Sequence, residues 1–378
     1  MTSVQTHDTN TAVPHKTTPL SNIGPVSQST DVSATSVHSV TLRAARLLAD
    51  LGVGDDFTLA RLSGGANNQV YRVDGSRRQV VLKSYFQYDD APYQGDRHDR
   101  LDAEYSFLTF AWGNGVRCVP RPLACDRRQG LAAYELVPGR RLATAEVDAA
   151  TVDQAIEFYR LLNAHKDSAR ATALADAAEA CYTLGEHLAC VERRLERLLR
   201  IEPTVGVARD AVDFVRSDLR ATWVRASRVA RHDAARNGLS LDQPIAGEER
   251  CLSPSDFGFH NALVDDQARL RFIDFEYAGW DDPAKLVCDF FCQPAVPVPR
   301  EYFDGFAEAI AFGLSKAEMH LRRFRLLLPV YQIKWCCILL NDFLPAGNRR
   351  REFAFSSPQE ERHARQLHKS RAALQQVA

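Results

Sequence analysis

One stretch, from Ser253 to Asp289, constrains this chain more than any other part of its sequence. Within it, Asp256 and Asn261 lie in a segment that also contains glycine and proline, which favours a tight loop. Residues 262–264 and 270–273 are apolar and β-prone, and the polar residues between them predict a hairpin turn. A hairpin returns the chain to where it began, so the residues at its open end lie side by side.

Asp274 follows the second predicted strand, and the hairpin therefore brings it beside Asn261, which precedes the first. Two carboxylates, Asp256 and Asp274, then converge with one amide oxygen. Hard oxygen ligands suit Mg²⁺, which keeps several waters and usually shares its shell with phosphates. We expect Asn261 and Asp274 to hold Mg²⁺, and Asp256 to orient a hydroxyl group and take its proton. This is the minimum equipment for phosphoryl transfer.

The N-terminal half predicts an antiparallel sheet with a glycine turn. Strands are expected at residues 57–62, 69–73, 79–85, 117–126 and 131–137. In the turn after the first strand, Gly64 and Gly65 let backbone N–H groups approach a phosphate closely, although such a turn is also found in ordinary hairpins. Lys83 ends the apolar third strand, where a lysine can simply decorate a sheet edge.

These motifs resemble the aminoglycoside phosphotransferase and choline kinase superfamily, whose members are relatives of the protein kinases. Members carry H-G-D-x-x-x-x-N, a hairpin, I-D-W/F-E, and then G-D-P with a further Asp. Asp256 and Asn261 match the first motif, residues 273–276 match the second, and residues 282–289 match the last. A surface turn followed by a polar hairpin is the alternative interpretation, and the order and spacing of the motifs disfavour it.

The glycine turn resembles the G-G-x-x-N-x-x-Y loop of the same superfamily, with Gly64, Gly65, Asn68 and Tyr71 at the matching positions. One departure from the pattern matters, because Pro254 occupies the place of the superfamily's His, two residues before the catalytic Asp. That His is mainly architectural in kinase-like folds, so we expect its loss to mark an atypical subgroup and not to abolish activity.

The resemblance implies where ATP or GTP binds. Gly64, Gly65 and Asn68 would cover the phosphates, and Lys83 would bind phosphate oxygens. A kinase of this class needs a helix whose Glu holds that lysine. A helix over residues 97–111 has an apolar stripe flanked by Glu104, with Asp102 as a competing candidate at a poorer angle. Residues Glu135 to Gly139 would form the hinge whose backbone contacts the base, or else an ordinary strand-to-helix turn.

The implied fold is α+β in two lobes, of the protein-kinase-like type. Residues 39–137 form a nucleotide-binding lobe with an antiparallel sheet and one main helix, preceded by a short helix over residues 40–51. Residues 138–378 form a largely helical lobe with the catalytic loop and the acceptor site. Residues 1–38 are rich in Ser and Thr and poor in large apolar groups, which predicts a disordered tail.

The helical lobe contains amphipathic segments over residues 184–198 and 212–230, whose polar faces carry many arginines. We expect these faces to be solvated, with an anionic partner as the sharper alternative. Further helices are predicted over residues 301–312 and 316–343, the latter with a capping box at Ser315 and Glu318 and a kink at Pro329, and a last one opens at residues 357–360. The aromatic residues near the end of the long helix are core residues or, if exposed, acceptor-pocket residues; the candidates are Tyr331, Trp335 and Phe343, with Trp280 and Glu276 beside them.

Composition narrows the class of protein. A net charge of −1 argues against a general nucleic-acid or membrane-surface binder. No apolar run approaches the length of a membrane span, and no secretory signal opens the chain. Nine cysteines without a Cys-x-x-Cys pair are typical of buried thiols in a reducing compartment, so we expect a cytoplasmic protein.

The sequence therefore predicts an ATP- or GTP-dependent, Mg²⁺-dependent kinase that phosphorylates a hydroxyl group of a small polar metabolite, such as a sugar or an amino alcohol. An aminoglycoside-type antibiotic-resistance kinase and a nucleotide-binding pseudokinase scaffold are the alternatives. A protein kinase is disfavoured because residues 274–282 leave no room for an activation segment. Neither the acceptor nor the oligomeric state follows from the sequence.

Overall fold

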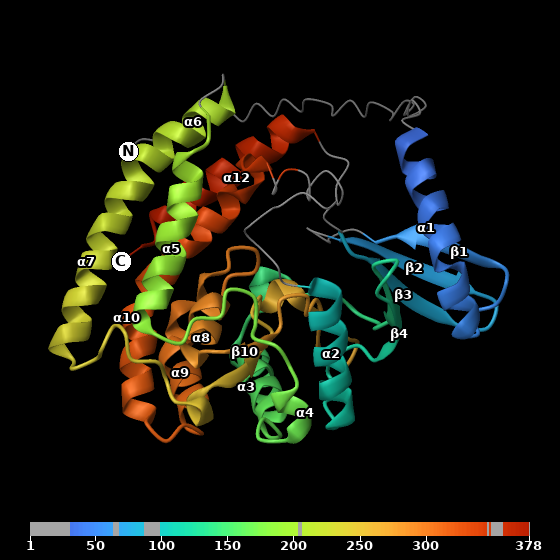
Figure 1. Cartoon of the computed structure of the whole chain (residues 1–378), viewed down its shortest axis with the longest axis horizontal. Helices are drawn as coiled ribbons and strands as arrows, with labels where there is room; N and C mark the ends of the chain where they lie inside the picture. The colour runs from blue at the N-terminus through green and yellow to red at the C-terminus, as the bar shows by residue number, and fades with distance from the viewer. Residues whose placement is uncertain are drawn as a thin grey trace, which may run out of the picture.

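The computed structural model describes residues 31–62, 68–86, 99–202, 206–345, 348 and 358–377, and of residues 31–38 it describes the backbone alone. Two lobes make up this part of the chain, with an antiparallel sheet at one end and a mostly helical lobe at the other (Figure 1). The predicted two-lobed α+β arrangement is confirmed. Residues 1–30 and the glycines Gly64 and Gly65 lie outside the described residues.

The N-lobe sheet has the strand order β1-β2-β3-β5-β4, and all neighbouring strands run antiparallel. The strands are β1 (Phe57–Arg61), β2 (Gln69–Gly75), β3 (Gln79–Ser84), β4 (Pro122–Asp126) and β5 (Leu131–Glu135). β3 lies in the middle of the sheet, so Lys83, opposite Val70 on one side and Ala132 on the other, is not on an edge strand. The edge-decoration interpretation of Lys83 is therefore wrong.

The fourth strand is shorter than predicted, beginning at Pro122 and not at Arg117. Pro120 and Pro122 lack backbone N–H groups, which removes ladder hydrogen bonds from this segment. The segment before the strand bonds the other lobe instead, since the carbonyl of Cys118 accepts a 2.7 Å hydrogen bond from the backbone N–H of Phe272.

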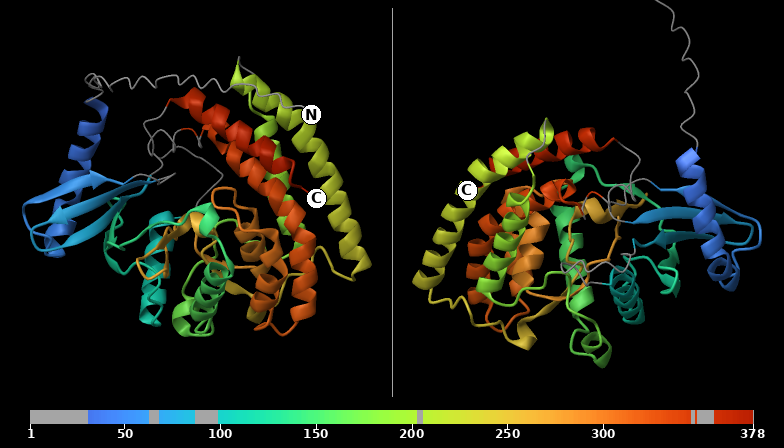
Figure 2. Two further views of the ribbon diagram at one scale, coloured as in Figure 1. Left: turned by 180° about the vertical axis from the view of Figure 1, so that it is seen from behind. Right: turned by 45° about the horizontal axis from the view of Figure 1, so that its top comes forward.

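Two helices cover the two faces of the sheet. α1 (Asp31–Asp50) packs Val40, Ala44, Leu47 and Leu48 onto one face. α2 (Arg100–Gly113) lies between the sheet and the helical lobe (Figures 1 and 2). α1 begins nine residues before the predicted start at Val40, because adding a residue to an existing helix is cheaper than nucleating one, even where the sequence is polar. Leu42, an apolar residue of the same helix, is 67% exposed.

The C-lobe is built mainly of helices, with two small sheets. Its helices are α3 (Ala149–Asn163), α4 (Ala169–Thr172), α5 (Leu184–Leu199), α6 (Val207–Phe214), α7 (Arg220–Arg236), α8 (Pro283–Cys292), α9 (Phe303–Ala311), α10 (Ala317–Leu339) and α12 (Gln359–Leu374). Its strands are β6 (Arg140–Arg141), β7 (Cys251–Ser253), β8 (Ala262–Val264), β9 (Leu270–Phe272) and β10 (Gly279–Asp281), which pair as β6-β8-β9 and β10-β7.

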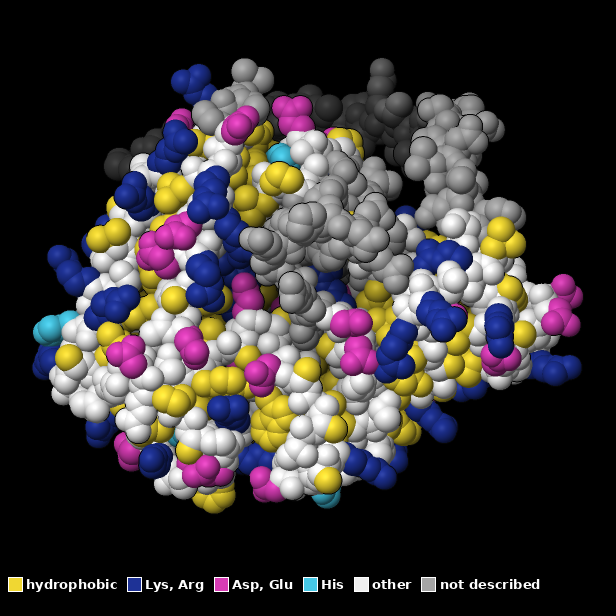
Figure 3. Space-filling view, in the orientation of Figure 1, with side chains coloured by type: hydrophobic (Ala, Val, Ile, Leu, Met, Phe, Trp, Pro, Cys, Tyr) yellow, Lys and Arg dark blue, Asp and Glu magenta, His cyan; other side chains and the backbone are white. Residues whose placement is uncertain are grey.

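A π-helical segment, Val215–Leu219, joins α6 to α7, and 3₁₀ turns occur at Thr144–Glu146, Gly247–Glu249, Phe259–Asn261, Arg300–Tyr302 and Leu340–Phe343. α5, α6, α7, α10 and α12 gather at the end of the molecule far from the N-lobe sheet in all views (Figures 1 and 2). The prediction of solvated arginines is wrong for Arg194, whose side chain is 12% exposed and pairs with Glu179. It is confirmed on the second segment, where the following arginines are exposed: Arg216, Arg220, Arg225, Arg228, Arg231 and Arg236. Figure 3 shows Lys and Arg side chains there with hydrophobic and acidic side chains between them.

The long helix α10 differs from its prediction at the start. The predicted capping box is wrong, since no side chain caps the helix and Lys316 is the N-cap residue. The N–H and hydroxyl groups of Ser315 bond Glu249 instead, a buried carboxylate that needs these partners. Pro329 lies inside the helix. In α12, Pro358 is the N-cap residue.

Within the described residues, one helix, Ala317–Phe343, has the length and apolar composition of a membrane span, contrary to the sequence expectation. However, 61% of its most apolar stretch is buried inside the protein. α10 packs against α5, α7, α8, α9 and α12. The apolar side chains of this helix therefore supply the core of the C-lobe.

Candidate active site

The predicted catalytic loop follows β7 and is anchored by two buried phenylalanines. Phe257 stacks on Phe290 of α8 with ring centroids 4.9 Å apart, and Phe259 meets the same ring edge-on at 5.1 Å. Asp256 precedes these anchors and keeps 31% of its side chain exposed. The alternation of polar and aromatic residues in this segment thus fixes the backbone in the core while leaving the carboxylate accessible.

Asp256 has two neighbours on its own loop. Asn261 donates from Nδ2 to the backbone oxygen of Asp256 at 3.0 Å and to its Oδ2 at 3.3 Å. The Nε2 atom of His260 lies 3.3 Å from Asp256 Oδ1. Sequence reasoning missed His260, although its position four residues after Asp256 was a usable signal.

The two partners shift each other's protonation. Burial acts to raise the pKa of Asp256, but the positive charge of His260 and the hydrogen bonds of His260 and Asn261 outweigh it, and the pKa is lowered. Burial acts to lower the pKa of His260, but the carboxylate of Asp256 outweighs it, and the pKa is raised. Asp256 is therefore held as a carboxylate that can accept a hydrogen bond from a hydroxyl group.

The hairpin has the predicted register, and it brings Asp274 to the loop. Ala262 pairs with Phe272 between β8 and β9, and the backbone N–H of Ile273 donates to the carbonyl of Asn261 at 2.8 Å. Asp274 then adopts a positive φ of 69°, which is uncommon for a residue with a side chain and marks a sharp change of direction. The predicted convergence of Asp274 and Asn261 is confirmed.

Lys83 reaches this hairpin from the other lobe. Its Nζ lies 2.7 Å from Glu104 Oε1 and 2.9 Å from Asp274 Oδ1. The predicted pairing of Lys83 with Glu104 is therefore confirmed, whereas the competing candidate Asp102 is exposed and pairs with Arg127. Burial acts to lower the pKa of Lys83, but the two carboxylates outweigh it and raise the pKa, so the lysine is charged.

Glu104 is held by further groups that the sequence did not indicate. The hydroxyl of Tyr85 donates to Glu104 Oε2 at 2.6 Å and lies 2.7 Å from the hydroxyl of Tyr134. The backbone N–H of Phe275 donates to Glu104 Oε1 at 3.3 Å. Tyr85 directly follows β3, Tyr134 lies in β5, and both pack in one core cluster with residues of α2. Such contacts between separate elements require the tertiary structure to be seen.

The remaining predicted nucleotide residues lie around the same junction. Asn68 is buried and donates to the carboxylate of Glu276 across the lobes. Burial, with the nearby charge of Asp274, raises the pKa of Glu276 to about 7. Glu135 ends β5, and its carboxylate accepts a 3.1 Å hydrogen bond from the backbone of Arg121. The roles of Asn68 and Glu135 in nucleotide binding stay predictions.

The residues predicted to hold Mg²⁺ fit a magnesium ion by their chemistry. Asn261 uses Nδ2 for Asp256, which leaves its amide oxygen as a ligand atom, and Asp274 offers a carboxylate that is 31% exposed. Within the described part of the chain no group of three or more His, Cys, Asp or Glu side chains is arranged to hold a metal. A site with two protein ligands accords with the habit of Mg²⁺ to complete its shell with phosphates and water.

The aromatic candidates for the acceptor pocket separate in the structure. Tyr331 is buried in the core, and the indole N–H of Trp280 donates to the carbonyl of Ala171 at 2.9 Å. Trp335 is partly exposed, meets the ring of His260 edge-on at 6.4 Å, and donates to Asp289 at 2.8 Å. Phe343 stacks on His363, and Glu276 pairs with Asn68. Trp335 therefore lies beside His260, the neighbour of Asp256 on the catalytic loop.

Comparison with known proteins bears on this site. A model of the phosphotransferase enzyme family matches residues 58–327. No curated protein matches the chain in sequence. Among solved structures, the ethanolamine kinase of Plasmodium vivax is similar with a TM-score of 0.55 and 14% identity, over 88% of this chain and 89% of that chain.

Two further structures have similar folds. A spectinomycin phosphotransferase in complex with ADP and spectinomycin gives a TM-score of 0.52 and 13% identity, over 88% of this chain and 98% of that chain. The choline kinase of Cryptosporidium parvum Iowa II gives a TM-score of 0.50 and 12% identity, over 91% of this chain and 97% of that chain. At these identities the likeness shows the fold, which is kinase-like as predicted.

Proposed function

The chain belongs to the phosphotransferase enzyme family, and on that premise we propose that it moves the γ-phosphoryl group of ATP or GTP to a hydroxyl group of a small polar metabolite. A sugar or an amino alcohol is the class of acceptor that we favour. One observation carries this proposal. Lys83 and Glu104 from the N-lobe meet Asp274 from the C-lobe, and the hairpin places Asp274 beside the loop of Asp256 and Asn261.

The phosphate end of the proposed site depends on charge. The ammonium group of Lys83 neutralises phosphate oxygens, and Glu104 keeps it at the right place because the Tyr85 hydroxyl fixes that carboxylate in turn. Asn261 and Asp274 hold Mg²⁺, which when bound offsets the negative charge of the phosphates. Preorganised charges of this kind stabilise a transition state without reorganisation.

The acceptor end depends on Asp256. Its carboxylate accepts a hydrogen bond from the acceptor hydroxyl and so orients the oxygen toward the γ-phosphorus. As the new O–P bond forms and the bond to the leaving nucleoside diphosphate breaks, the hydroxyl proton passes to Asp256. His260 and Asn261 contact the same carboxylate and limit its rotation.

Two alternative functions predict a different acceptor or no phosphoryl transfer at all. An aminoglycoside-type resistance kinase is suggested by the likeness to a spectinomycin phosphotransferase. Polycationic acceptors favour an acidic pocket, however, and here Lys334 pairs with Asp289 and His260 with Asp256. A pseudokinase scaffold is suggested by Pro254, but every predicted catalytic position carries the required residue type.

The test is a screen for phosphoryl transfer with purified protein, Mg²⁺ and ATP or GTP against a library of sugars, amino alcohols and aminoglycosides. We expect a phosphorylated hydroxyl product that requires Mg²⁺ and that disappears in the Asp256→Asn variant. Tight binding of Mg-nucleotide with no product across the library would contradict the proposal and support the scaffold alternative. Product from aminoglycosides alone would replace the acceptor class.

A further inference from the structure

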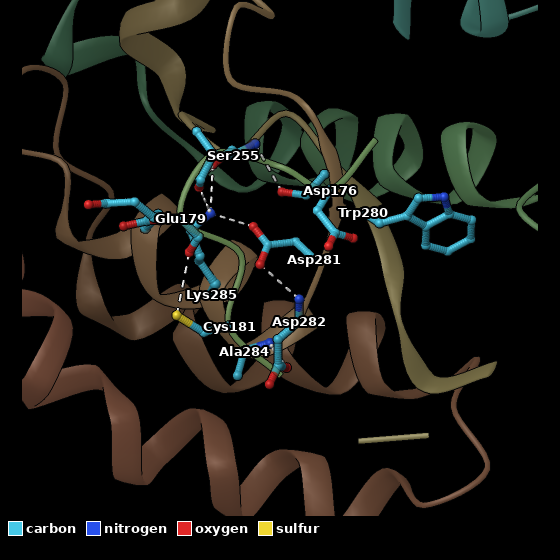
Figure 4. Close-up of polar contacts among 12 residues, drawn as sticks. Asp176, Glu179, Cys181, Ser255, Trp280, Asp281, Asp282, Ala284 and Lys285 are labelled. Carbon is cyan, nitrogen blue, oxygen red and sulfur yellow. Dashed lines mark hydrogen bonds and ion pairs between the residues drawn. The ribbon is translucent and has the colours of Figure 1, made fainter. Parts of the chain in front are cut away.

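A second buried lysine lies directly behind the catalytic loop (Figure 4). Lys285, on the first turn of α8, is 1% exposed. Its Nζ donates to the carboxylate of Asp281, to the hydroxyl of Ser255 at 2.7 Å and to the carbonyl of Ala178 at 2.9 Å. An ammonium group has three N–H donors, and all three are used by partners from three different segments.

Ser255 is the partner that connects this lysine to catalysis. It directly precedes Asp256 and has a φ of 65°, in the left-handed region that residues with a side chain rarely adopt. The H-G-D pattern of the superfamily has glycine at this position, which adopts such a φ without strain. A serine there needs support from its surroundings, because a strained backbone persists only when neighbouring groups fix it.

The support available to Ser255 comes chiefly from its side chain. Its hydroxyl accepts from Lys285 and lies 3.5 Å from the carbonyl of Ala178. Its backbone N–H donates to Ser253 Oγ at 3.0 Å. The residue before it, Pro254, has no side-chain donor and no backbone N–H. Its carbonyl accepts from the backbone N–H of Asp256 at 2.8 Å, which is a contact within the loop and does not tie Ser255 to another segment.

An ion pair between Asp281 and Lys285 alone would not require this arrangement. Buried ion pairs are costly, and well-packed apolar residues often replace them without loss of stability. Here the pair is placed where its two remaining N–H donors reach the catalytic loop and the segment before α5. The carbonyl of Ala178 also belongs to a segment that bonds β10, since the N–H of Ala177 donates to the carbonyl of Trp280 at 2.9 Å.

We propose that Lys285 is a positioning residue, which holds Ser255 in its left-handed conformation and thereby sets the direction in which the following carboxylate, Asp256, is presented. The effect of Lys285 on turnover rests on the proposed function, whereas its effect on the conformation of the loop does not. Lys285 acts through Ser255 and touches neither the nucleotide nor the acceptor.

The test is a double-mutant cycle of Lys285→Met and Ser255→Gly, because glycine adopts the positive φ without the lysine. Hydrogen–deuterium exchange of the Ser255 and Asp256 amides, measured without substrate, reports on the loop. We expect Lys285→Met to raise their exchange about 10-fold in the native background, as the loss of a support for a strained residue implies. In the Ser255→Gly background the increase is expected to be much smaller.

Turnover and nucleotide KM give the second readout, with any acceptor found in the screen. Lys285→Met should lower kcat and leave the KM for Mg-nucleotide unchanged, and Ser255→Gly should recover part of the lost kcat. The control is Arg362→Met on α12, which breaks a buried pair with Asp342 and should leave loop exchange unchanged. If Lys285→Met does not fold, every protein of the cycle also carries Asp281→Asn. This change replaces the carboxylate that the loss of Lys285 would leave buried and unpaired.

Equal effects of Lys285→Met in both backgrounds, on exchange and on kcat, would overturn the inference and leave Lys285 as a general stabiliser. The failures are distinguishable. Exchange that follows the cycle in a protein that phosphorylates nothing supports the inference and contradicts the proposed function. An enzyme that loses turnover in Asp256→Asn, but whose loop exchange and kcat do not change in Lys285→Met, supports the proposed function and contradicts the inference about Lys285.

Discussion

Lys83 and Lys285 are both buried lysines whose ammonium groups are fully engaged, yet their surroundings differ in charge and in access to solvent. Lys83 contacts two carboxylates, Glu104 and Asp274, and Asp274 keeps 31% of its side chain exposed. Lys285 contacts one carboxylate, Asp281, with no exposed side-chain surface, and two neutral oxygens. The first cluster has excess negative charge and an open side, whereas the second is balanced and closed.

The difference separates binding from support. A cluster with an uncompensated carboxylate at an accessible edge attracts a cation such as Mg²⁺, and with it the phosphates that the cation bridges. A neutral, closed cluster has nothing left to offer a ligand, but it ties together the segments that supply its partners. Burial and pairing alone therefore do not identify the functional lysine.

The largest expected effect is on turnover at the first lysine. Lys83→Ala should lower turnover by about 10²–10³-fold, because a preorganised charge on the phosphates is lost. Steady-state kinetics with the acceptor from the screen measures this. Lys285→Met, which removes a charge of the same sign one loop away, should cost about 10-fold, as loss of positioning implies. Equal losses at the two lysines would contradict the division between binding and support.

The order should reverse for stability. Lys285→Met should cost about 3–5 kcal/mol, because Asp281 becomes a fully buried unpaired carboxylate. Lys83→Ala should cost less, since Asp274 has access to water and Glu104 retains the Tyr85 hydroxyl. Chemical denaturation of both variants measures the free energy of unfolding. A larger loss at Lys83 would show that the first cluster is the structural one.

Most residues of the Lys83 cluster could be predicted from the sequence, because they follow from local patterns. The hairpin register and the position of Asp274 follow from short-range spacing, and α2 with Glu104 follows from helical periodicity. The second cluster was not accessible, because Lys285 reaches Ser255 across 30 positions. The contact between Asn68 and Glu276 was not accessible either, because it spans 208 positions. The predicted capping box at Ser315 failed for the same reason, since Glu249, 66 positions away, takes the serine.

A smaller effect on turnover is expected one step from Lys83. Glu104→Ala should lower turnover by roughly 10-fold, because Lys83 keeps Asp274 as a partner but loses its fixed position. The matched control is Asp102→Ala on the same helix, whose exposed pair with Arg127 should contribute nothing to kinetics. Unchanged kinetics for Glu104→Ala with a loss for Asp102→Ala would show that the helix assignment is wrong.

The smallest expected effect is on how stability depends on pH, and it concerns His187 in the C-lobe. His187 is buried between Asp282 and Tyr331, and burial lowers its pKa below the usual 6.5 despite the carboxylate of Asp282. The unfolded chain then binds more protons, so stability should fall as pH drops below about 6.5, by at most about 1.4 kcal/mol per pH unit. His187→Gln should be less stable at pH 7.5 but lose less on acidification to pH 5.5. Denaturation curves at both values measure this, and an unchanged slope would contradict it.

The central claim is that Asp256 and Asp274, two carboxylates at one site, do different work. Calorimetric titration with Mg-nucleotide, paired with product formation, measures both on the same variants. We predict that Asp274→Ala weakens Mg-dependent nucleotide binding, whereas Asp256→Asn binds Mg-nucleotide as the unmodified protein does and loses turnover by about 10²-fold or more. Product formation by Asp256→Asn at the unmodified rate would contradict the account.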